Sequence, residues 1–417
     1  MVSEQAKNVA DCVSQARLLD NLATLSRFGA LANGGVNRQA LSADDLDARA
    51  WLIDLAQSLG CDVMTDEAAN LFIRRAGVDD LPPVVTGSHI DTQPSGGNLD
   101  GCYGVMAGIE CLTALNEAGI VTRRPLDVVI WTNEEGSRFA PGAMGSNAFV
   151  NPEYLAAYQN NQDQNGVTLK EALADCHRRF SLPRRAKYPM AAFIELHIEQ
   201  GPVLEQAGLP LATVQGIQGV RWYQVVCSGQ SAHAGTTPMS SRADAMTLAR
   251  RLTDRIENAL SDVPADQLRL TFGSWQVMPN SINTIAGQVS FTIDFRHPDA
   301  EVLARFDTVI AGFAADNVTV TSLLHQAPVA FDPPLLAQQQ ACCDALAIPT
   351  TQLVSGAFHD AMCLARHCPT SMFFVPSHKG ISHNPAEYTD PHSLWLGARA
   401  LACCLTELAN PLTGVNL

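Results

Sequence analysis

In the first half of the chain, segments with the apolar pattern of buried strands alternate with segments of helical periodicity. Short apolar runs at residues 82–91, 125–131 and 191–199 have the length of buried strands. Residues 43–59 and 104–119 instead show helical spacing, and the second of these helices is expected to end at its closing glycine. Because strands and helices follow one another, the pattern predicts an α/β layer with a mainly parallel sheet.

The spacing of apolar and polar residues changes near residue 216. Strictly alternating strands now appear, and in residues 288–296 the apolar side chains all fall on one face, which is typical of a sheet covered on one side. This order of strands and helices predicts a self-contained α+β domain with a four-stranded antiparallel sheet and two helices, inserted at 213–328 into a discontinuous domain of residues 1–212 and 329–417. Its expected elements are, in chain order, 220–229, 242–260, 268–278, 288–296, 301–315 and 318–324.

Composition narrows the class of protein. The 417 residues suggest two or three domains. The formal net charge of -15 argues against a nucleic-acid or anionic-membrane partner, although a small anion could still be held by one or two arginines. No apolar run approaches the ~18 residues that span a bilayer, and the N-terminus lacks the apolar core of a signal peptide. The 12 cysteines contain no C-x-x-C pair, so we expect reduced thiols and a cytoplasmic location.

The first candidate site residues lie in the polar segment at the carboxyl end of the first predicted strand. His89 and Asp91 come where open α/β sheets place their ligands, beyond the carboxyl ends of strands. His89 is a candidate metal ligand, and Asp91 is expected to hold its imidazole; a lone strand-end histidine is, however, more often structural. The glycines of residues 95–104 allow a tight turn that presents Asp100, although aspartate is also a common turn residue.

Later segments supply further candidates of the same kind. Glu134 and Glu135 follow a predicted strand side by side, which is unfavourable unless they face solvent or a cation. His197 lies on the polar face of another strand, and His383 follows a third. Together with the earlier pair, these residues form a nitrogen and oxygen ligand set for hydrolytic metals.

Five such ligands serve two metal ions if one carboxylate bridges them. Asp100 is the natural bridge, with His89 and His197 completing one site and Glu135 and His383 the other. Two ions about 3.5–4 Å apart can share a water and lower its pKa. We therefore expect two divalent metal ions per subunit; zinc suits the ligands, and manganese, cobalt or nickel could occupy the same set.

At this point the chain resembles a known family, the hydantoinase/carbamoylase amidohydrolases. These include N-carbamoyl-L-amino-acid hydrolases, β-ureidopropionases, and allantoate and ureidoglycolate amidohydrolases, and they are related to zinc aminopeptidases and aminoacylases. The resemblance implies a zinc-aminopeptidase-like catalytic domain, an inserted lid domain through which two subunits dimerise, and hydrolysis of a ureido C–N bond. It covers about residues 85–390 and rests on "GSHIDT", "GGNLDG", "NEEGSRF", "ELHIEQGPVLE", "HAGTTPM" and "GISHNPAE".

The resemblance separates the two adjacent glutamates. Glu135 matches a metal ligand, whereas Glu134 matches the general base that takes a proton from the attacking water and passes it to the leaving nitrogen. His233 matches a lid histidine that stabilises the developing oxyanion, often in the partner's active site.

Substrate contacts are also implied by the resemblance. Asn283 and Arg296 match a clamp for the substrate carboxylate, which arginine binds bidentately. Gln200 matches a contact to a substrate amide, and His359 is expected to line the site. In the family the residue before this histidine is usually glycine; Phe358 stands there instead and is expected to reshape the pocket.

These features predict an amidohydrolase that converts N-carbamoyl-L-amino acids, or N-carbamoyl-β-alanine, to the amino acid, carbon dioxide and ammonia. Hydrolysis of allantoate or ureidoglycolate is the nearest alternative, because the metal set, the base and the clamp would be shared. Peptide or N-acyl cleavage is a second alternative. A protein that binds a small molecule without turnover is a third, and the presence of Glu134 argues against it.

Overall fold

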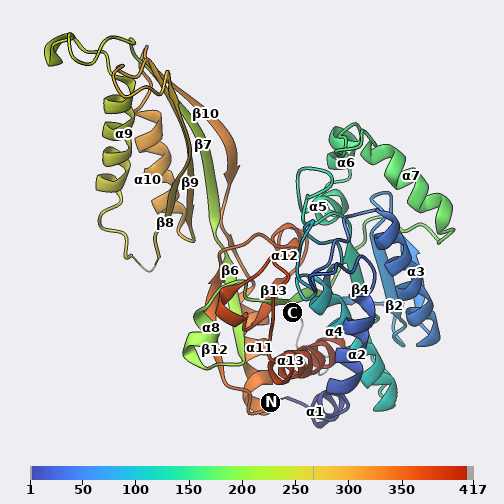
Figure 1. Ribbon diagram of the computed structural model, residues 1–417. Coiled ribbons are helices and arrows are strands. Elements are labelled where there is room, and N and C mark those ends of the chain that lie inside the picture. The colour runs from blue at the N-terminus through green and yellow to red at the C-terminus, as the bar shows by residue number, and fades with distance from the viewer. Residues whose placement is uncertain (1, 266, 411–417) are drawn as a thin grey trace. The chain divides into compact units, whose positions relative to one another are not determined.

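The computed structural model describes residues 2–265 and 267–410 (Figure 1). The chain forms two compact units, the first from the residues up to Gln215 together with those from Phe331 onward, and the second from Gly216–Ala330. The sequence predicts these boundaries at 212/213 and 328/329.

The first unit is organised around a large mixed sheet with the order β1-β2-β4-β3-β5-β13-β6-β11, and β12 pairs with β6. The central strands β4, β3, β5 and β13 run parallel. The parallel prediction is thus confirmed at the centre, but β2 and β6 flank it in antiparallel fashion. The strands are β1 Asp62–Thr65, β2 Leu71–Arg75, β3 Val84–His89, β4 Leu126–Trp131, β5 Ala192–Ile198, β6 Leu211–Ile217, β11 Val329–Ala330, β12 Thr350–Ser355 and β13 Thr370–Val375.

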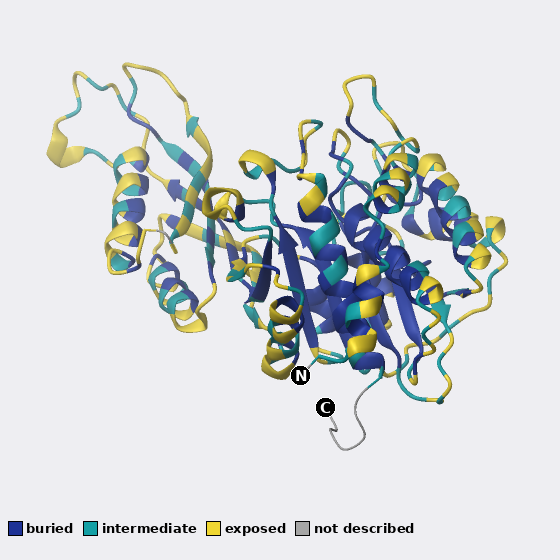
Figure 2. Cartoon of the chain, turned by 90° about the horizontal axis from the view of Figure 1, so that it is seen from below, coloured by how far each residue is buried: buried dark blue, intermediate teal, exposed yellow. Residues whose placement is uncertain are grey.

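Helices bury this sheet, whose central strands and neighbouring helix surfaces are the darkest part of Figure 2. Helix α4 packs against β3, β5 and α13, which explains why it is apolar almost all round. The helices of this unit are α1 Glu4–Asp11, α2 Gln15–Leu25, α3 Ala43–Ser58, α4 Cys102–Glu117, α5 Met144–Val150, α6 Glu153–Tyr158, α7 Leu169–Arg179, α8 Val203–Ala207, α11 Pro333–Ala345, α12 Asp360–Leu364, η2 His378–Gly380 and α13 Pro391–Ala409.

The second unit has the predicted β-α-β-β-α-β order and a four-stranded antiparallel sheet, β10-β7-β9-β8. The apolar residues of β9 alternate with partly exposed ones and are buried, as predicted. Helix α9 begins three residues later than expected, because the Asp244 carboxylate caps it by accepting the Met246 and Thr247 N–H groups. The elements are β7 Gly219–Ser228, η1 Met239–Ser241, α9 Ala245–Ala259, β8 Arg269–Met278, β9 Gln288–His297, α10 Ala300–Ala311 and β10 Val318–Gln326.

Two further observations bear on the class of protein. Within the described part of the chain, none of the helices combines the length and the hydropathy that crossing a membrane requires. All 12 cysteines are free thiols, and most of them are buried.

Candidate metal centre and active site

The parallel centre of the large sheet gathers the candidate ligands at one edge. His89 is the last residue of β3 and pairs in register with Trp131 at the end of β4, just before the glutamate pair. His197, near the end of β5, pairs with Phe374 of β13, after which the chain continues to His383. Parallel strands end at the same edge, so four segments far apart in sequence deliver their polar residues to one place.

Asp100 lies at the centre of these residues. Its Oδ1 is 3.1 Å from His197 Nε2 and 3.6 Å from His89 Nε2, while its Oδ2 is 3.1 Å from His383 Nε2. The next residue, Gly101, has φ +64°, and a Cβ there would come within 2.4 Å of His89 Nε2. Only glycine therefore allows Asp100 to approach the imidazoles this closely.

Main-chain carbonyls orient two of the imidazoles. His89 Nδ1 lies 2.9 Å from the carbonyl oxygen of Asp91, and His197 Nδ1 lies 2.9 Å from that of Ile198. With the Nδ1 proton donated to these carbonyls, Nε2 is the nitrogen that each ring turns toward Asp100. In this structure Nε2 of His197 also accepts the Gly101 N–H at 3.1 Å.

The candidate ligands form two groups around the shared aspartate. One consists of His89, Asp100 and His197, and the other of Asp100, Glu135 and His383; within each group the ligand atoms lie within 4.8 Å of one another. These are the two ligand sets predicted from the sequence for two ions. Imidazole nitrogens and carboxylate oxygens at this spacing fit zinc and the other divalent metals of hydrolytic sites.

A third group, Glu195, His197 and His359, is also close enough to hold an ion. The Glu195 carboxylate, however, already accepts hydrogen bonds from Ser88 Oγ at 2.7 Å and from the Ala361 N–H at 2.9 Å. Both Glu195 oxygens are thus hydrogen-bonded to a hydroxyl and a peptide group, whereas Asp100 Oδ1 lies against two imidazoles. The two groups around Asp100 are therefore the better candidates to hold metal.

The carboxylates and imidazoles of the cluster shift one another's pKa values, as expected where negative charge is gathered to bind a cation. Burial by itself would raise the pKa of Asp100, but hydrogen bonds from His197, His383 and His89 outweigh it and hold the pKa well below its usual value. The hydrogen bond to Asp100 raises the pKa of His383 to about 9, even though burial opposes it. Burial and the nearby Asp100 charge raise the pKa of Glu135 to about 7.

The adjacent glutamates are held by Asp91. Its carboxylate accepts the Glu134 N–H with one oxygen and the Glu135 N–H with the other, each at 3.2 Å. This corrects the expected role of Asp91: its carboxylate lies 3.8 Å from His89 Nδ1, and its main-chain carbonyl, rather than the side chain, orients the imidazole. The side chain instead satisfies the two peptide groups that carry the catalytic candidates.

Glu134 and Glu135 point to different members of the cluster. Glu134 Oε2 lies 3.5 Å from His89 Nε2, whereas Glu135 Oε2 lies 3.5 Å from His383 Nε2 and accepts a hydrogen bond from Gln93 Nε2 at 2.7 Å. Glu134 is buried, and burial followed by repulsion from Asp360 and Glu135 raises its pKa well above the usual value. A carboxyl group in this environment is suited to holding a proton.

Gln200 and His359, the predicted substrate contacts of this unit, both lie beside the cluster. Gln200 Nε2 donates to Asp100 Oδ2 at 2.9 Å, and its Oε1 is buried without a hydrogen-bond partner. The His359 ring centroid is 4.5 Å from that of His197, and burial followed by the His197 charge lowers its pKa well below the usual value. Both causes favour the neutral form of the His359 imidazole.

The other predicted site residues belong to the second unit. The segments of His233 and Asn283 lie side by side there, since the Ala234 N–H donates to the Asn283 carbonyl at 2.9 Å. Arg296, on the polar face of β9, forms an ion pair with Asp294 at 2.9 Å. Their roles at the metal cluster stay predictions.

Sequence reasoning missed several residues that contact the cluster, among them Gln93, Ser382 and Glu387. The carboxylate of Glu387 accepts N–H groups from the Asp100 turn. The available signal was an acidic residue four positions after His383 in the same quoted motif.

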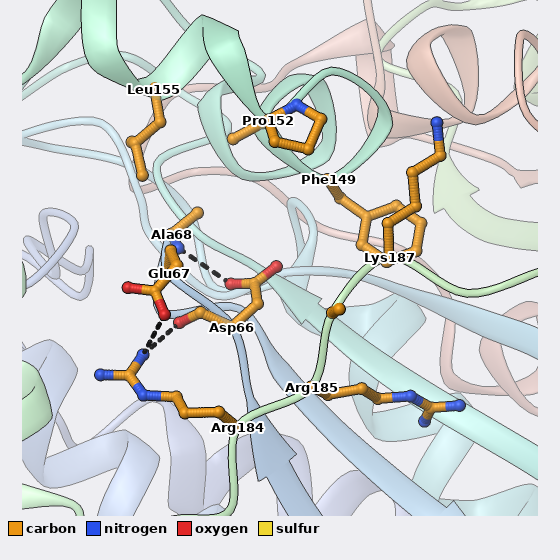
Figure 3. A pocket seen from close by; sticks show the side chains of 11 residues that line it. Asp66, Glu67, Ala68, Phe149, Pro152, Leu155, Arg184, Arg185 and Lys187 are labelled. Atoms are coloured by element: carbon orange, nitrogen blue, oxygen red, sulfur yellow. Dashed lines mark hydrogen bonds and ion pairs between the residues drawn. The ribbon is translucent and has the colours of Figure 1, made fainter.

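A separate cavity of about 480 Å³ lies in the first unit (Figure 3). Its charged groups bond to nearby protein groups: Asp66 Oδ1 accepts the Ala68 N–H at 3.0 Å, and Arg184 donates to the Asp66 carbonyl at 2.7 Å. None of the ligand groups found among the described residues lines it. The cluster at the strand ends is therefore the better candidate for the active site.

Residues 85–407 match peptidase family M20/M25/M40, and the chain belongs to this family. It is 37% identical over 410 residues to the N-carbamoyl-L-amino acid amidohydrolase of Geobacillus stearothermophilus, covering 94% of this chain and 98% of that protein. It is 35% identical over 401 residues to the allantoate amidohydrolase of Bacillus subtilis (strain 168), covering 94% and 97% of the two chains.

A solved structure extends this likeness to the fold. A hydantoinase/carbamoylase family amidase from Burkholderia multivorans matches with a TM-score of 0.88 and 42% identity, over 95% of this chain and 98% of its own. These findings confirm the family resemblance drawn from the motifs. The chain is an amidohydrolase that acts on non-peptide C–N bonds.

Proposed function

We propose that this protein hydrolyses the ureido C–N bond of N-carbamoyl-L-amino acids, or of N-carbamoyl-β-alanine, to the amino acid, carbon dioxide and ammonia. The observation that carries the proposal is the Asp100 carboxylate, which directs one oxygen to His89 and His197 and the other to His383, beside the buried Glu134. This arrangement suits two ions and a separate base.

Two divalent ions, zinc first and otherwise manganese, cobalt or nickel, would be held by the two groups around Asp100. When bound, such ions lower the pKa of water and polarise the substrate carbonyl. Glu134 accepts a proton from the attacking water and delivers it to the leaving nitrogen, serving as base and then as acid. The carbamate that leaves decays to carbon dioxide and ammonia.

We assign the substrate's polar groups to the remaining predicted residues. Arg296 and Asn283 bind the carboxylate, and His233 donates a hydrogen bond to the developing oxyanion. The ion pair between Arg296 and Asp294 is partly exposed, so exchanging it for a substrate carboxylate costs little. The buried, unpaired Oε1 of Gln200 is suited to accept a substrate N–H, and the neutral His359 completes the lining.

Phe358 favours a substrate with an apolar side chain. The residue is 42% exposed although it is a large hydrophobic one. It lies beside Gly142, where a Cβ would come within 3.0 Å of Phe358 Cζ and within 2.4 Å of the Glu134 carbonyl oxygen. An exposed aromatic ring next to the Glu134 segment offers apolar contact area to the side chain of an N-carbamoyl amino acid.

Allantoate hydrolysis is the second candidate, because the Bacillus subtilis relative that carries this name is almost as similar in sequence. Allantoate holds a second ureido group in place of an amino-acid side chain. It would therefore gain less from the Phe358 ring.

A substrate panel tests the proposal. The metal-reconstituted protein is expected to release ammonia faster from N-carbamoyl-L-amino acids with apolar side chains than from N-carbamoyl-β-alanine, allantoate or ureidoglycolate, as measured by a coupled ammonia assay. A preference for allantoate would replace the first candidate with the second. Cleavage of N-acyl amino acids or dipeptides without ureido cleavage, or tight binding without turnover, would overturn the proposed reaction.

Replacing Phe358 by glycine is expected to lower kcat/KM for N-carbamoyl-L-leucine by roughly 10-fold or more, because loss of an apolar contact is worth about 1–3 kcal/mol. N-carbamoylglycine, which has no side chain, serves as the internal control and should change little. Phe358→Leu keeps an apolar surface and should retain most of the discrimination. An unchanged leucine-to-glycine ratio in Phe358→Gly would contradict the assignment.

Two further parts of the proposal come from the family resemblance and the composition. We propose dimerisation through the second unit, with His233 serving an active site across the dimer. The free thiols support a reducing compartment and hence a cytoplasmic location.

A further inference from the structure

Glu387 accepts three hydrogen bonds from the loops that carry the metal ligands, although Asp100 is far from it in sequence. It lies in the loop between η2 and α13, and only 7% of its surface is exposed. One carboxylate oxygen accepts the N–H groups of Leu99 at 2.9 Å and of Asp100 at 3.0 Å. The other oxygen accepts the hydroxyl of Ser382 at 2.9 Å.

These three bonds join two loops that carry ligands of the same metal group. The first loop presents Asp100, and the second presents His383 directly after Ser382. The Ser382 hydroxyl also lies 3.1 Å from Asp100 Oδ2, and Gln200 Nε2 lies within hydrogen-bonding distance of both, at 3.2 and 2.9 Å. Neither loop is held by a strand ladder at these positions, so side chains must fix its main chain.

Gly97 gives independent evidence that the Glu387 position is built into the fold. A Cβ at residue 97 would come within 2.1 Å of Glu387 Oε1 and within 2.5 Å of its Cβ. A glycine is therefore required here to make room for the glutamate. This explains why the turn that ends in Asp100 contains a glycine so close to the ligand.

We propose that Glu387 is a positioning residue that preorganises the Asp100–Glu135–His383 metal group. The inference rests on the proposed two-metal function and adds a residue to it. Glu387 fixes the Asp100 main chain and the Ser382–His383 loop at once, so both ligands stand at the right spacing before a cation arrives. Ordering these loops in advance removes an entropic cost from metal binding.

The test measures metal binding directly. In Glu387→Ala, titration of the chelator-stripped protein with Mn²⁺ or Zn²⁺ against a chromophoric chelator is expected to show the equivalent at the Asp100–Glu135–His383 group weakened about 10- to 100-fold. The other equivalent shares Asp100 but not the His383 loop, so it should weaken less. Glu387→Gln keeps an amide oxygen that can accept both N–H groups, and its affinity should lie within a few-fold of wild type. Wild-type affinities for both equivalents in Glu387→Ala would overturn the proposal.

The chain offers a matched control in Asp244. Its carboxylate likewise accepts two main-chain N–H groups, from Met246 and Thr247, and the Thr247 hydroxyl, but it caps α9 in the second unit. Asp244→Ala should lower thermal stability as a lost helix cap does, while both metal equivalents bind as in wild type. Equal loss of metal in both variants would show a general folding defect and refute the specific role.

A second variant guards against misfolding of Glu387→Ala. Gly97→Ala leaves the carboxylate in the chain but forces it away from its donors, and it should weaken the same metal equivalent. Excess metal should restore much of the activity of either variant, because the catalytic groups are intact. Failure of the proposed function would appear differently: wild-type protein itself would bind no second metal equivalent, or His383→Ala would bind as many equivalents as wild type.

Discussion

Replacing Glu134 by glutamine is expected to lower kcat by about 10²- to 10⁴-fold, while two metal equivalents stay bound. The substitution keeps the size of the side chain and removes its ability to take a proton. Glu134 lies near His89 and not in either ligand group around Asp100, so its loss should spare the metals. Steady-state kinetics, together with metal analysis of the same preparation, measures both effects.

Two companion variants sharpen this experiment. Glu135→Gln should lose one metal equivalent, because Glu135 belongs to the group with His383. Glu171→Gln is the neutral control: it lies in the capping box of α7, where glutamine serves as well as glutamate. Near wild-type turnover of Glu134→Gln with both metals bound would remove Glu134 from the mechanism.

Metal removal is expected to abolish activity, and rebinding should depend steeply on pH. The hydrogen bond to Asp100 raises the pKa of His383 to about 9, so below pH 9 a cation must displace a proton from this ring. Below about pH 7 it must also displace one from Glu135. Apparent affinity at this group should therefore fall about tenfold per pH unit from pH 9 to pH 7, and more steeply below pH 7. Calorimetry in buffers of different ionisation enthalpy measures the protons released.

The raised pKa values of Glu135 and His383 also determine how the stability of the chelator-stripped protein changes with pH. Both pKa values are raised by folding, so the stability they contribute is complete at low pH and is lost as pH rises through about 7 for Glu135 and about 9 for His383. Thermal unfolding should then show the largest gain on metal addition above pH 9. A metal affinity that does not change between pH 7 and pH 9 would contradict this account.

The local pattern of apolar and polar residues was enough to predict the strands that carry the candidate ligands. The apolar run before His89 predicts β3, and the alternation in residues 288–296 predicts the face that β9 buries. The antiparallel β1–β2 hairpin at the edge of the large sheet was not predicted. Its strands are short and partly polar, so the pairing of β1 with β2 and of β2 with β4 depends on neighbouring strands more than on their own pattern.

Metal ligands are predictable because their chemistry is carried by residue type: imidazole and carboxylate groups at strand ends indicate a cation site whatever their detailed contacts. The hydrogen-bond partners of carboxylates are not predictable in this way. Asp91 is two residues from His89, yet its side chain serves the Glu134–Glu135 peptides instead. Glu387 meets Leu99 and Asp100 from 288 and 287 positions away in the chain.

The sequence by itself thus determined the two-unit organisation expected here, the ligand candidates around Asp100 and the family. The tertiary structure alone decided how the adjacent glutamates divide between His89 and His383, and which carboxylates hold the loops that carry them. The reason is physical: residue type and periodicity are local properties, whereas a buried carboxylate bonds whichever donors the packed chain brings within about 3 Å.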